Sequence, residues 1–156
     1  MTLLALLLLL AGERSALGVF DRWAALRDSD GPRCFAIARP VRDDGSADRR
    51  GGFASVAARQ RSTRIPGVFF RLSRPRGLGA EVTLAIGERR FALVGDLAIA
   101  RAPDAASDRA IVGAMRGGRT MTVSTVDAAG RAIVDSYTLT GAPTAIDAAQ
   151  LGCAQR

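Results

Sequence analysis

Short apolar segments separated by polar turns follow one another along most of the chain. Val82, Leu84 and Ile86 share one face of an extended segment. Glu81 and Thr83 share the other face. This period of two residues predicts a strand with one buried face, as in an antiparallel sheet. Similar segments predict further strands at residues 17–26, 34–38, 53–59, 68–73, 91–94, 119–126 and 132–139.

Two of the turns between these segments are short, polar and contain glycine. Residues 87–90 form one of them. Residues 127–131 form the other, in which Gly130 suits a left-handed backbone. Because β-rich segments flank both turns, each turn predicts a β-hairpin.

Two short helices are expected among the strands. The first covers about residues 104–116, where Asp104 or Ser107 provides an N-terminal cap and Gly117-Gly118 ends the helix. The second covers about residues 142–151 and is rich in alanine. Together, the elements predict a mainly β fold: a compact antiparallel β-sandwich or barrel-like domain with two short helices.

The length of 156 residues suits one domain with its own core. No repeat or linker divides the chain, so residues 18–156 are expected to form a single β-rich domain. Residues 3–11 differ from the rest, because they form an apolar run that is too short to span a bilayer as a helix.

This apolar run matches the hydrophobic region of a secretory signal. We therefore expect residues 1–12 to be a signal peptide, cleaved somewhere in 12–18, and the mature chain to have no transmembrane helix. No Lys or Arg precedes the run, so a buried N-terminal helix or strand is the alternative. Export would place the protein in the periplasm or outside the cell.

The composition excludes several kinds of chemistry. All 22 basic residues are arginine, there are 15 acidic residues, and histidine is absent. Ser-His-Asp and Cys-His catalysis are therefore excluded, and no metal site, cofactor or catalytic residue is expected. The net charge of +7 would suit a nucleic-acid partner, but the arginines are scattered and the absence of lysine is typical of GC-rich coding. We expect no nucleic-acid partner.

Arginine is densest at Arg59, Arg61 and Arg64, which form a candidate anion-binding surface. Cys34 and Cys153 are the only cysteines. In an exported protein they are expected to form one disulfide, and two free buried thiols are the alternative.

Trp23 and Tyr137, the only residues of their kinds, are both expected to fill the core. The Tyr137 hydroxyl is expected to bond to a loop. A ligand platform at Trp23 and an acid or base role for Tyr137 are the alternatives. The second would need a partner, and the chain has no lysine to provide one.

Three segments carry a resemblance to a known family. They are Gly18-Val19-Phe20-Asp21-Arg22-Trp23, the cysteine-led strand that ends at Pro40, and Tyr137-Thr138-Leu139-Thr140-Gly141 before the alanine-rich helix. In these segments the chain resembles the invasion-associated locus B family of small exported bacterial proteins. Asp21 stands where the family often has glycine, and Ala142-Pro143 replaces the usual aromatic residue.

This resemblance implies an exported β-rich envelope protein without established catalytic residues. The expected function is therefore a non-enzymatic binding or interaction module, whose partner is another envelope protein or an anionic surface component. An enzyme that acts on an acidic envelope substrate through an arginine-lined site is the alternative.

Overall fold

The computed structural model describes residues 14–29, 33–58 and 67–154. These residues form ten strands and two helices. In chain order they are β1 (Arg14–Phe20), β2 (Trp23–Asp28), β3 (Cys34–Ala38), β4 (Phe53–Ala57), β5 (Val68–Arg71), β6 (Val82–Ile86), β7 (Arg89–Leu93), β8 (Ile99–Arg101), α1 (Ala105–Gly117), β9 (Thr120–Val126), β10 (Ala132–Thr138) and α2 (Ala142–Ala154). The expected signal peptide, residues 1–12, lies outside the described residues, and the strand β1 begins at Arg14.

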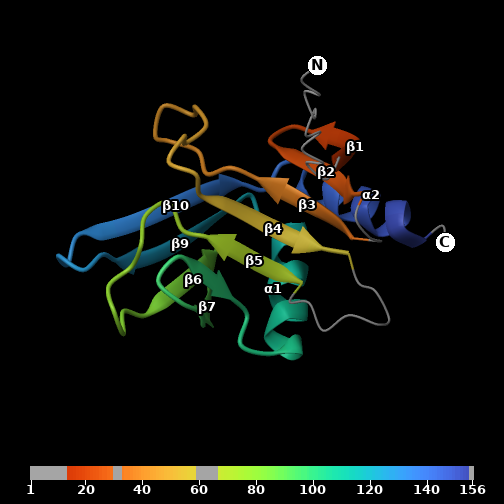
Figure 1. The fold of residues 1–156 in the computed structure, drawn as a ribbon. Helices are drawn as coiled ribbons and strands as arrows, with labels where there is room; N and C mark the ends of the chain where they lie inside the picture. Colours follow the sequence, from red (N-terminus) through yellow and green to blue (C-terminus); the bar gives the residue numbers. More distant parts are fainter. Residues whose placement is uncertain (1–13, 30–32, 59–66, 155–156) are drawn as a thin grey trace, which may run out of the picture.

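The strands form two separate antiparallel sheets, so the predicted mainly β fold is confirmed as a sandwich. The larger sheet has the order β1-β2-β3-β4-β5-β8, and the smaller one has the order β10-β9-β6-β7. Buried side chains of both sheets belong to one hydrophobic cluster. In Figure 1, α1 lies beside β5, and α2 lies along β1, β2 and β3.

Residues 17–26 are not the single strand that was predicted. They belong to the hairpin β1–β2, in which Phe20 is opposite Trp23 and a two-residue turn lies between them. Asp21 has φ 56°, a left-handed backbone that aspartate tolerates better than most residues. The segment is apolar on both sides of this turn, which is why its pattern resembled one strand. The three-residue strand β8, at the edge of the larger sheet, was also not predicted.

Alanine lines much of the inner face of the larger sheet. Ala25, Ala36 and Ala54 are buried there, and Ala145 and Ala149 of α2 are buried as well. Because these side chains are small, α2 can approach β2 and β3 closely. The rest of the core is filled by larger side chains from both sheets and α1, among them Trp23, Phe70, Leu84, Ile111, Met115 and Tyr137.

The first helix begins as the sequence predicts. Asp104 is its N-terminal cap and accepts a hydrogen bond from the backbone N–H of Ser107 at 2.7 Å. Asp108 in the first turn accepts one from the backbone N–H of Val68 at 2.7 Å, which joins α1 to the start of β5. Within the described residues, no helix is long and apolar enough to cross a membrane.

Candidate functional site

A disulfide joins the third strand of the described domain to its C-terminal helix. Cys34, the first residue of β3, is bonded to Cys153 in the last turn of α2, and their Cα atoms are 5.9 Å apart. Beside it, Arg27 donates a side-chain hydrogen bond to the carbonyl oxygen of Gly152. The positive charge of Arg27 also interacts favourably with the negative end of the helix dipole, which lies at the C-terminus of α2. The disulfide and Arg27 therefore hold the end of α2 against the larger sheet.

The outer face of the same sheet carries a groove with a volume of about 910 Å³. Its floor is largely apolar, because the side chains opposite the alanine-rich inner face include Phe35, Ile37, Phe53 and Phe69. Ala24, Ile37, Ser55 and Phe69 lie directly opposite one another on β2, β3, β4 and β5, so they form a row across the sheet. The groove therefore lies on a sheet face and not at a strand edge.

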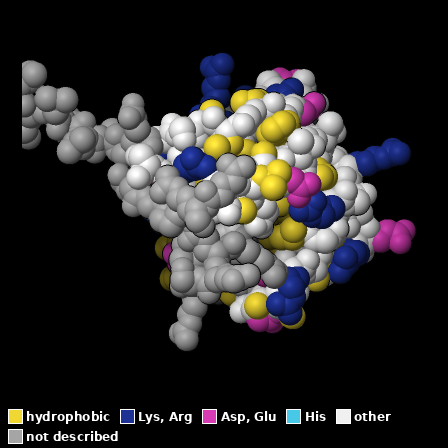
Figure 2. Space-filling view, turned by 90° about the vertical axis from the view of Figure 1, so that its right-hand side faces the viewer, with side chains coloured by type: hydrophobic (Ala, Val, Ile, Leu, Met, Phe, Trp, Pro, Cys, Tyr) yellow, Lys and Arg dark blue, Asp and Glu magenta, His cyan; other side chains and the backbone are white. Residues whose placement is uncertain are grey.

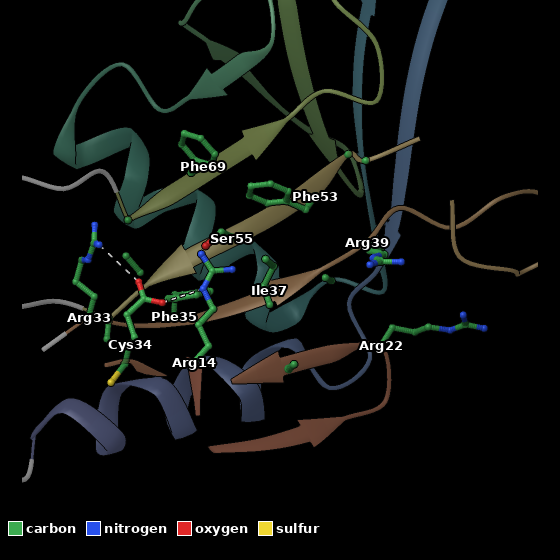
Figure 3. A pocket seen from close by; sticks show the side chains of 18 of the residues that line it. Arg14, Arg22, Arg33, Cys34, Phe35, Ile37, Arg39, Phe53, Ser55 and Phe69 are labelled. Carbon is green, nitrogen blue, oxygen red and sulfur yellow. Dashed lines mark hydrogen bonds and ion pairs between the residues drawn. The ribbon is translucent and has the colours of Figure 1, made fainter. Parts of the chain in front are cut away.

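Aromatic rings form one wall of the groove. Phe53 and Phe69 stack with their ring centroids 5.9 Å apart and an interplanar angle of 29°. Figure 3 shows Ser55 between this stacked pair and the side chains of Phe35 and Ile37 on the neighbouring strand. Phe35, Ile37, Phe53 and Phe69 are only half-buried, and no helix or strand of the described chain covers them. They leave a trough above the small Ser55 side chain.

Among the residues that the structure describes, five arginines line the groove, most of them towards its two ends. In Figure 3, Arg33 is at one end and Arg22 and Arg39 are at the other, while the Arg14 side chain reaches from the Arg33 side towards Ser55. Arg49 belongs with Arg22 and Arg39, because the neighbouring backbone N–H of residue 48 bonds to the carbonyl oxygen of residue 40 at 2.7 Å. The groove therefore combines an apolar floor with a cationic rim.

The two ends differ in how far their charge is neutralised. Asp28 is 3.0 Å from the Arg14 Nε and 3.7 Å from Arg33, so one carboxylate partly neutralises both cations. The Arg14 guanidinium also lies 5.8 Å from the Phe35 ring centroid, within range of a cation–π contact. Among the described residues, Arg22, Arg39 and Arg49 have no ion pair. We call these three residues the arginine end of the groove.

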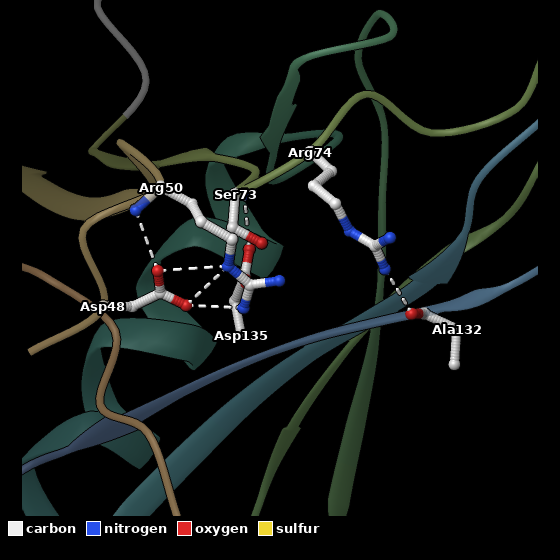
Figure 4. A network of polar contacts seen from close by, with 6 residues as sticks. All are labelled: Asp48, Arg50, Ser73, Arg74, Ala132 and Asp135. Carbon is white, nitrogen blue, oxygen red and sulfur yellow. Dashed lines mark hydrogen bonds and ion pairs between the residues drawn. The ribbon is translucent and has the colours of Figure 1, made fainter. Parts of the chain in front are cut away.

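A buried polar network supports the loop that carries Arg49. Asp48 accepts hydrogen bonds from the Arg50 side chain, with Nε at 2.9 Å from Oδ2, and from the Arg50 backbone N–H at 2.8 Å (Figure 4). The hydrogen bonds from Arg50 hold the pKa of Asp48 below its ordinary value, although burial acts in the opposite direction. The Asp48 carboxylate is therefore charged and paired at neutral pH.

A second part of this network lies on β10. Asp135 is buried and accepts a hydrogen bond from the backbone N–H of Ser73 at 2.8 Å. The Arg74 side chain donates a hydrogen bond to the carbonyl oxygen of Ala132 at 2.6 Å (Figure 4). This bond gives a partner to a backbone carbonyl on β10, an edge strand of the smaller sheet. These contacts are structural, because they join the loops between strands and do not line the groove.

Trp23 and Tyr137 are both completely or almost completely buried. Trp23 Nε1 donates to the carbonyl oxygen of Thr138 at 2.8 Å, and this bond links the larger sheet to the end of β10. Within the described chain, the Tyr137 hydroxyl has no hydrogen-bond partner, so the expected bond to a loop is not seen there. Burial, with a further contribution from Asp135, raises the pKa of Tyr137 and opposes an acid or base role.

The predicted anion-binding arginines Arg59, Arg61 and Arg64 lie outside the described residues, and their role stays a prediction. The described residues on either side of them, Ala58 and Gly67, both line the groove. In the described ranges, no three His, Cys, Asp or Glu side chains form a group that could hold a metal ion. Figure 2 shows arginines spread singly over one face of the molecule, without a continuous basic stripe.

Neither the groove nor its arginine end was predicted from the sequence. One signal for it is present in β3 and β4, where Phe35, Ile37 and Phe53 alternate with cysteine and alanine. Since the larger side chains lie opposite the core face, the outer face was bound to be apolar. The grouping of Arg22, Arg39 and Arg49 had no local signal, because it depends on how the strands pair.

No family model and no curated protein matches this chain. Among solved structures, it is similar to the crystal structure of invasion associated protein B from Bartonella henselae, with a TM-score of 0.59 and 17% sequence identity. The match covers 85% of this chain and 94% of that chain. The resemblance predicted from the two ends of the sequence is thus confirmed at the level of the fold, and the chain has the fold of invasion associated protein B.

Proposed function

We propose that this chain is a distant, exported member of the invasion-associated locus B family. It works as a non-enzymatic binding module of the bacterial envelope, in the periplasm or outside the cell, and its binding site is the groove on the outer face of the larger sheet. The observation that carries the proposal is the apolar floor of this groove together with its arginine end. Such a mixed lining is typical of binding sites, in which apolar surface supplies affinity and a few polar groups orient the ligand.

Export is supported by the disulfide between Cys34 and Cys153 and by the apolar run at residues 3–11. Disulfides persist in oxidising compartments and are rare in the cytosol. The beginning of β1 at Arg14 favours cleavage at the early side of the 12–18 range, because a later cut would remove part of the strand.

The alternative of an enzyme with an arginine-lined site receives less support. A general acid in such a site needs a carboxyl whose pKa is raised towards neutral pH. Of the two carboxylates that line the groove in the described part of the chain, Asp48 has a lowered pKa because Arg50 bonds to it, and Asp28 is paired with two arginines. Both carboxylates therefore balance charge, which fits a binding groove better than a proton-transfer site.

Fractionation of cells that express the chain with a C-terminal reporter tests the export. We expect the cleaved protein outside the cytoplasm, with both cysteines protected from alkylation until a reductant is added. An uncleaved chain in the cytoplasm would defeat this part of the proposal.

Co-sedimentation of the purified, oxidised protein with isolated envelope fragments tests the binding. We expect Phe53→Ser and Phe69→Ser, which change the groove floor, to reduce the sedimented fraction. Ser124→Phe, on the exposed outer face of the smaller sheet, is the control and leaves it unchanged. Sedimentation that is equal in all variants would contradict binding through the groove.

A further inference from the structure

We propose that the groove binds one molecule of a lipid with a phosphate head group, with the head at the arginine end and an alkyl chain along the apolar trough above Ser55. This inference rests on the proposed binding function and names the class of its ligand. It rests on three features of the groove: the unequal charge at its two ends, the hydrogen bonding of its floor strands to their neighbours, and its size.

The charge asymmetry determines which end takes the head group. At the end near Arg14 and Arg33, Asp28 accepts contacts from both guanidinium groups. At the arginine end, Arg22, Arg39 and Arg49 line the groove, and none of them pairs with a carboxylate of the described chain. Guanidinium groups bind phosphate through paired, charge-assisted hydrogen bonds, and three of them match the multiple oxygens of a phosphate group.

These three arginines lie at the same end of the groove because of the strand register. Trp23 is opposite Ala38, so the preceding Arg22 and the following Arg39 lie at the same end of β2 and β3. The loop with Arg49 is held beside them by the bonds between Arg50 and Asp48. The arginine end is thus built from two strand ends and one braced loop.

The backbone beneath the groove favours an alkyl chain over a peptide. The floor strands β2, β3, β4 and β5 are all internal, since β1 and β8 flank them, and their backbone groups pair with neighbouring strands. A peptide that lies across this face would find no backbone partners for its own N–H and C=O groups, and burying them unpaired is unfavourable. An alkyl chain has no such groups and gains free energy from contact with Phe35, Phe53 and Phe69.

The size of the groove suits a single ligand molecule. Its volume of about 910 Å³ lies in the range of small-molecule sites, which hold roughly 300–1,000 Å³. The two ends of the groove are separated along the strands, because Arg33 directly precedes β3 and Arg39 directly follows it; these six residue steps, at about 3.3 Å each, make the groove roughly 20 Å long. The row from Ala24 to Phe69 runs across four strands and, with a spacing of about 4.8 Å between strands, makes the floor roughly 14 Å wide. A groove of this length accommodates one alkyl chain with its head group at one end.

Calorimetric titration of the oxidised protein, at one fixed ionic strength and below the micelle concentration, tests the inference. The ligands are dodecyl phosphate, inorganic phosphate and dodecyl maltoside. We expect dodecyl phosphate to saturate one site per chain with an affinity at least about tenfold above either other ligand, because only it engages the head and chain contacts together.

Two groove variants assign the contacts. The triple variant Arg22→Gln/Arg39→Gln/Arg49→Gln should lower the affinity for dodecyl phosphate about tenfold or more. Its affinity for dodecyl maltoside should not change. Ser55→Phe fills the trough on the solvent side of β4, so it should lower the affinity for both dodecyl phosphate and dodecyl maltoside. The matched controls are Arg119→Gln, directly before β9, and Ser124→Phe, on β9 of the smaller sheet; both replace exposed side chains and should leave the binding of all three ligands unchanged. Circular dichroism and the thermal midpoint verify that each variant is folded.

The inference is overturned if the folded protein shows no saturable binding of dodecyl phosphate, or if both groove variants bind it as the unaltered protein does. An acidic, aromatic peptide of about eight residues is titrated in parallel. If it binds at least as tightly as dodecyl phosphate and loses affinity in the triple variant, the lipid class is wrong while the binding module stands. The proposed binding function itself is tested separately by the co-sedimentation with envelope fragments, because that experiment does not depend on the choice of a ligand.

Discussion

Cys34 and Cys153 are separated by 119 positions in the sequence, and a disulfide brings their Cα atoms to 5.9 Å. Cys34 begins the strand whose outer face supplies Phe35 and Ile37 to the groove. Cys153 lies in the last turn of the helix that covers the inner face of the same strand. The bond therefore fixes the two layers beneath the candidate site.

Removal of this disulfide should lower the free energy of unfolding substantially. The enclosed loop is long, so the chain-entropy model gives a loss of about 3–5 kcal/mol for the double variant Cys34→Ala/Cys153→Ala. Urea unfolding of the variant and the unaltered protein, each with and without dithiothreitol, measures it. The unaltered protein in reductant should approach the variant, and the variant should not respond to reductant. A variant as stable as the oxidised protein would contradict this role.

Trp23 gives a second test, because its indole lies in the core and donates a hydrogen bond to Thr138. Trp23→Phe removes the bond, leaves a carbonyl oxygen unpaired and opens a small cavity, which should cost about 2–4 kcal/mol. Circular dichroism at increasing urea measures the loss. In the unaltered protein, the emission of this sole tryptophan should shift to longer wavelength on unfolding; an emission maximum that already matches the unfolded chain would place the indole in water.

The local patterns in the sequence predicted the elements well where one face is buried and the other is exposed. Val82, Leu84 and Ile86 are buried as their spacing indicates. The first helix, expected at about residues 104–116, occupies Ala105–Gly117. In both cases, the period of the apolar positions and the terminal residues were sufficient, since these are local properties of the chain.

The remaining features depend on contacts between distant residues. The turn at Asp21 was missed because apolar residues flank it on both sides, and β8 is only three residues long. The groove arises from the pairing of β2, β3, β4 and β5, which brings together side chains that are far apart in the sequence. No period within a single strand reports such an arrangement.

Two glycines with left-handed backbones provide a matched pair of variants. Gly141 has φ 84°, and a Cβ atom there would collide with the carbonyl oxygen of Phe20, at the turn between β1 and β2. Gly130 has φ 75°, but a Cβ atom there would meet nothing within 4 Å. Gly130→Ala should therefore cost only the backbone strain, about 1–2 kcal/mol.

Gly141→Ala should cost more, about 3–5 kcal/mol, because the backbone at the start of α2 must also move. Urea unfolding of both variants measures the two losses side by side. Equal losses would mean that the start of α2 adjusts freely and that its contact with the β1–β2 turn is not tight.

The ion pair of Asp48 and Arg50 predicts a specific dependence of stability on pH. The pKa of Asp48 is held below the ordinary value of 3.8, chiefly by the Arg50 side chain. Because the folded pKa is the lower one, the carboxylate stabilises the fold fully above the unfolded pKa, and this contribution is lost as the pH falls through the folded pKa. Asp48→Asn cannot ionise, so the difference between the two proteins should be constant from pH 5 to 7 and shrink below about pH 4.

We expect this difference to be about 1–2 kcal/mol at neutral pH, a modest value because Arg50 is half exposed and the pair is screened by water. Urea unfolding at a series of pH values from 3 to 7, followed by Trp23 emission, measures it. Asp43→Asn in the same loop is the control: Asp43 is exposed, and its replacement should change stability by less than about 0.5 kcal/mol.

Several other carboxyls also have lowered pKa values and will reduce stability in acid, namely Asp44, Asp96, Asp104, Asp127 and Asp147. They are common to both proteins and cancel in the difference, so a difference that persists unchanged to pH 3 would show that the Asp48 charge does not stabilise the loop.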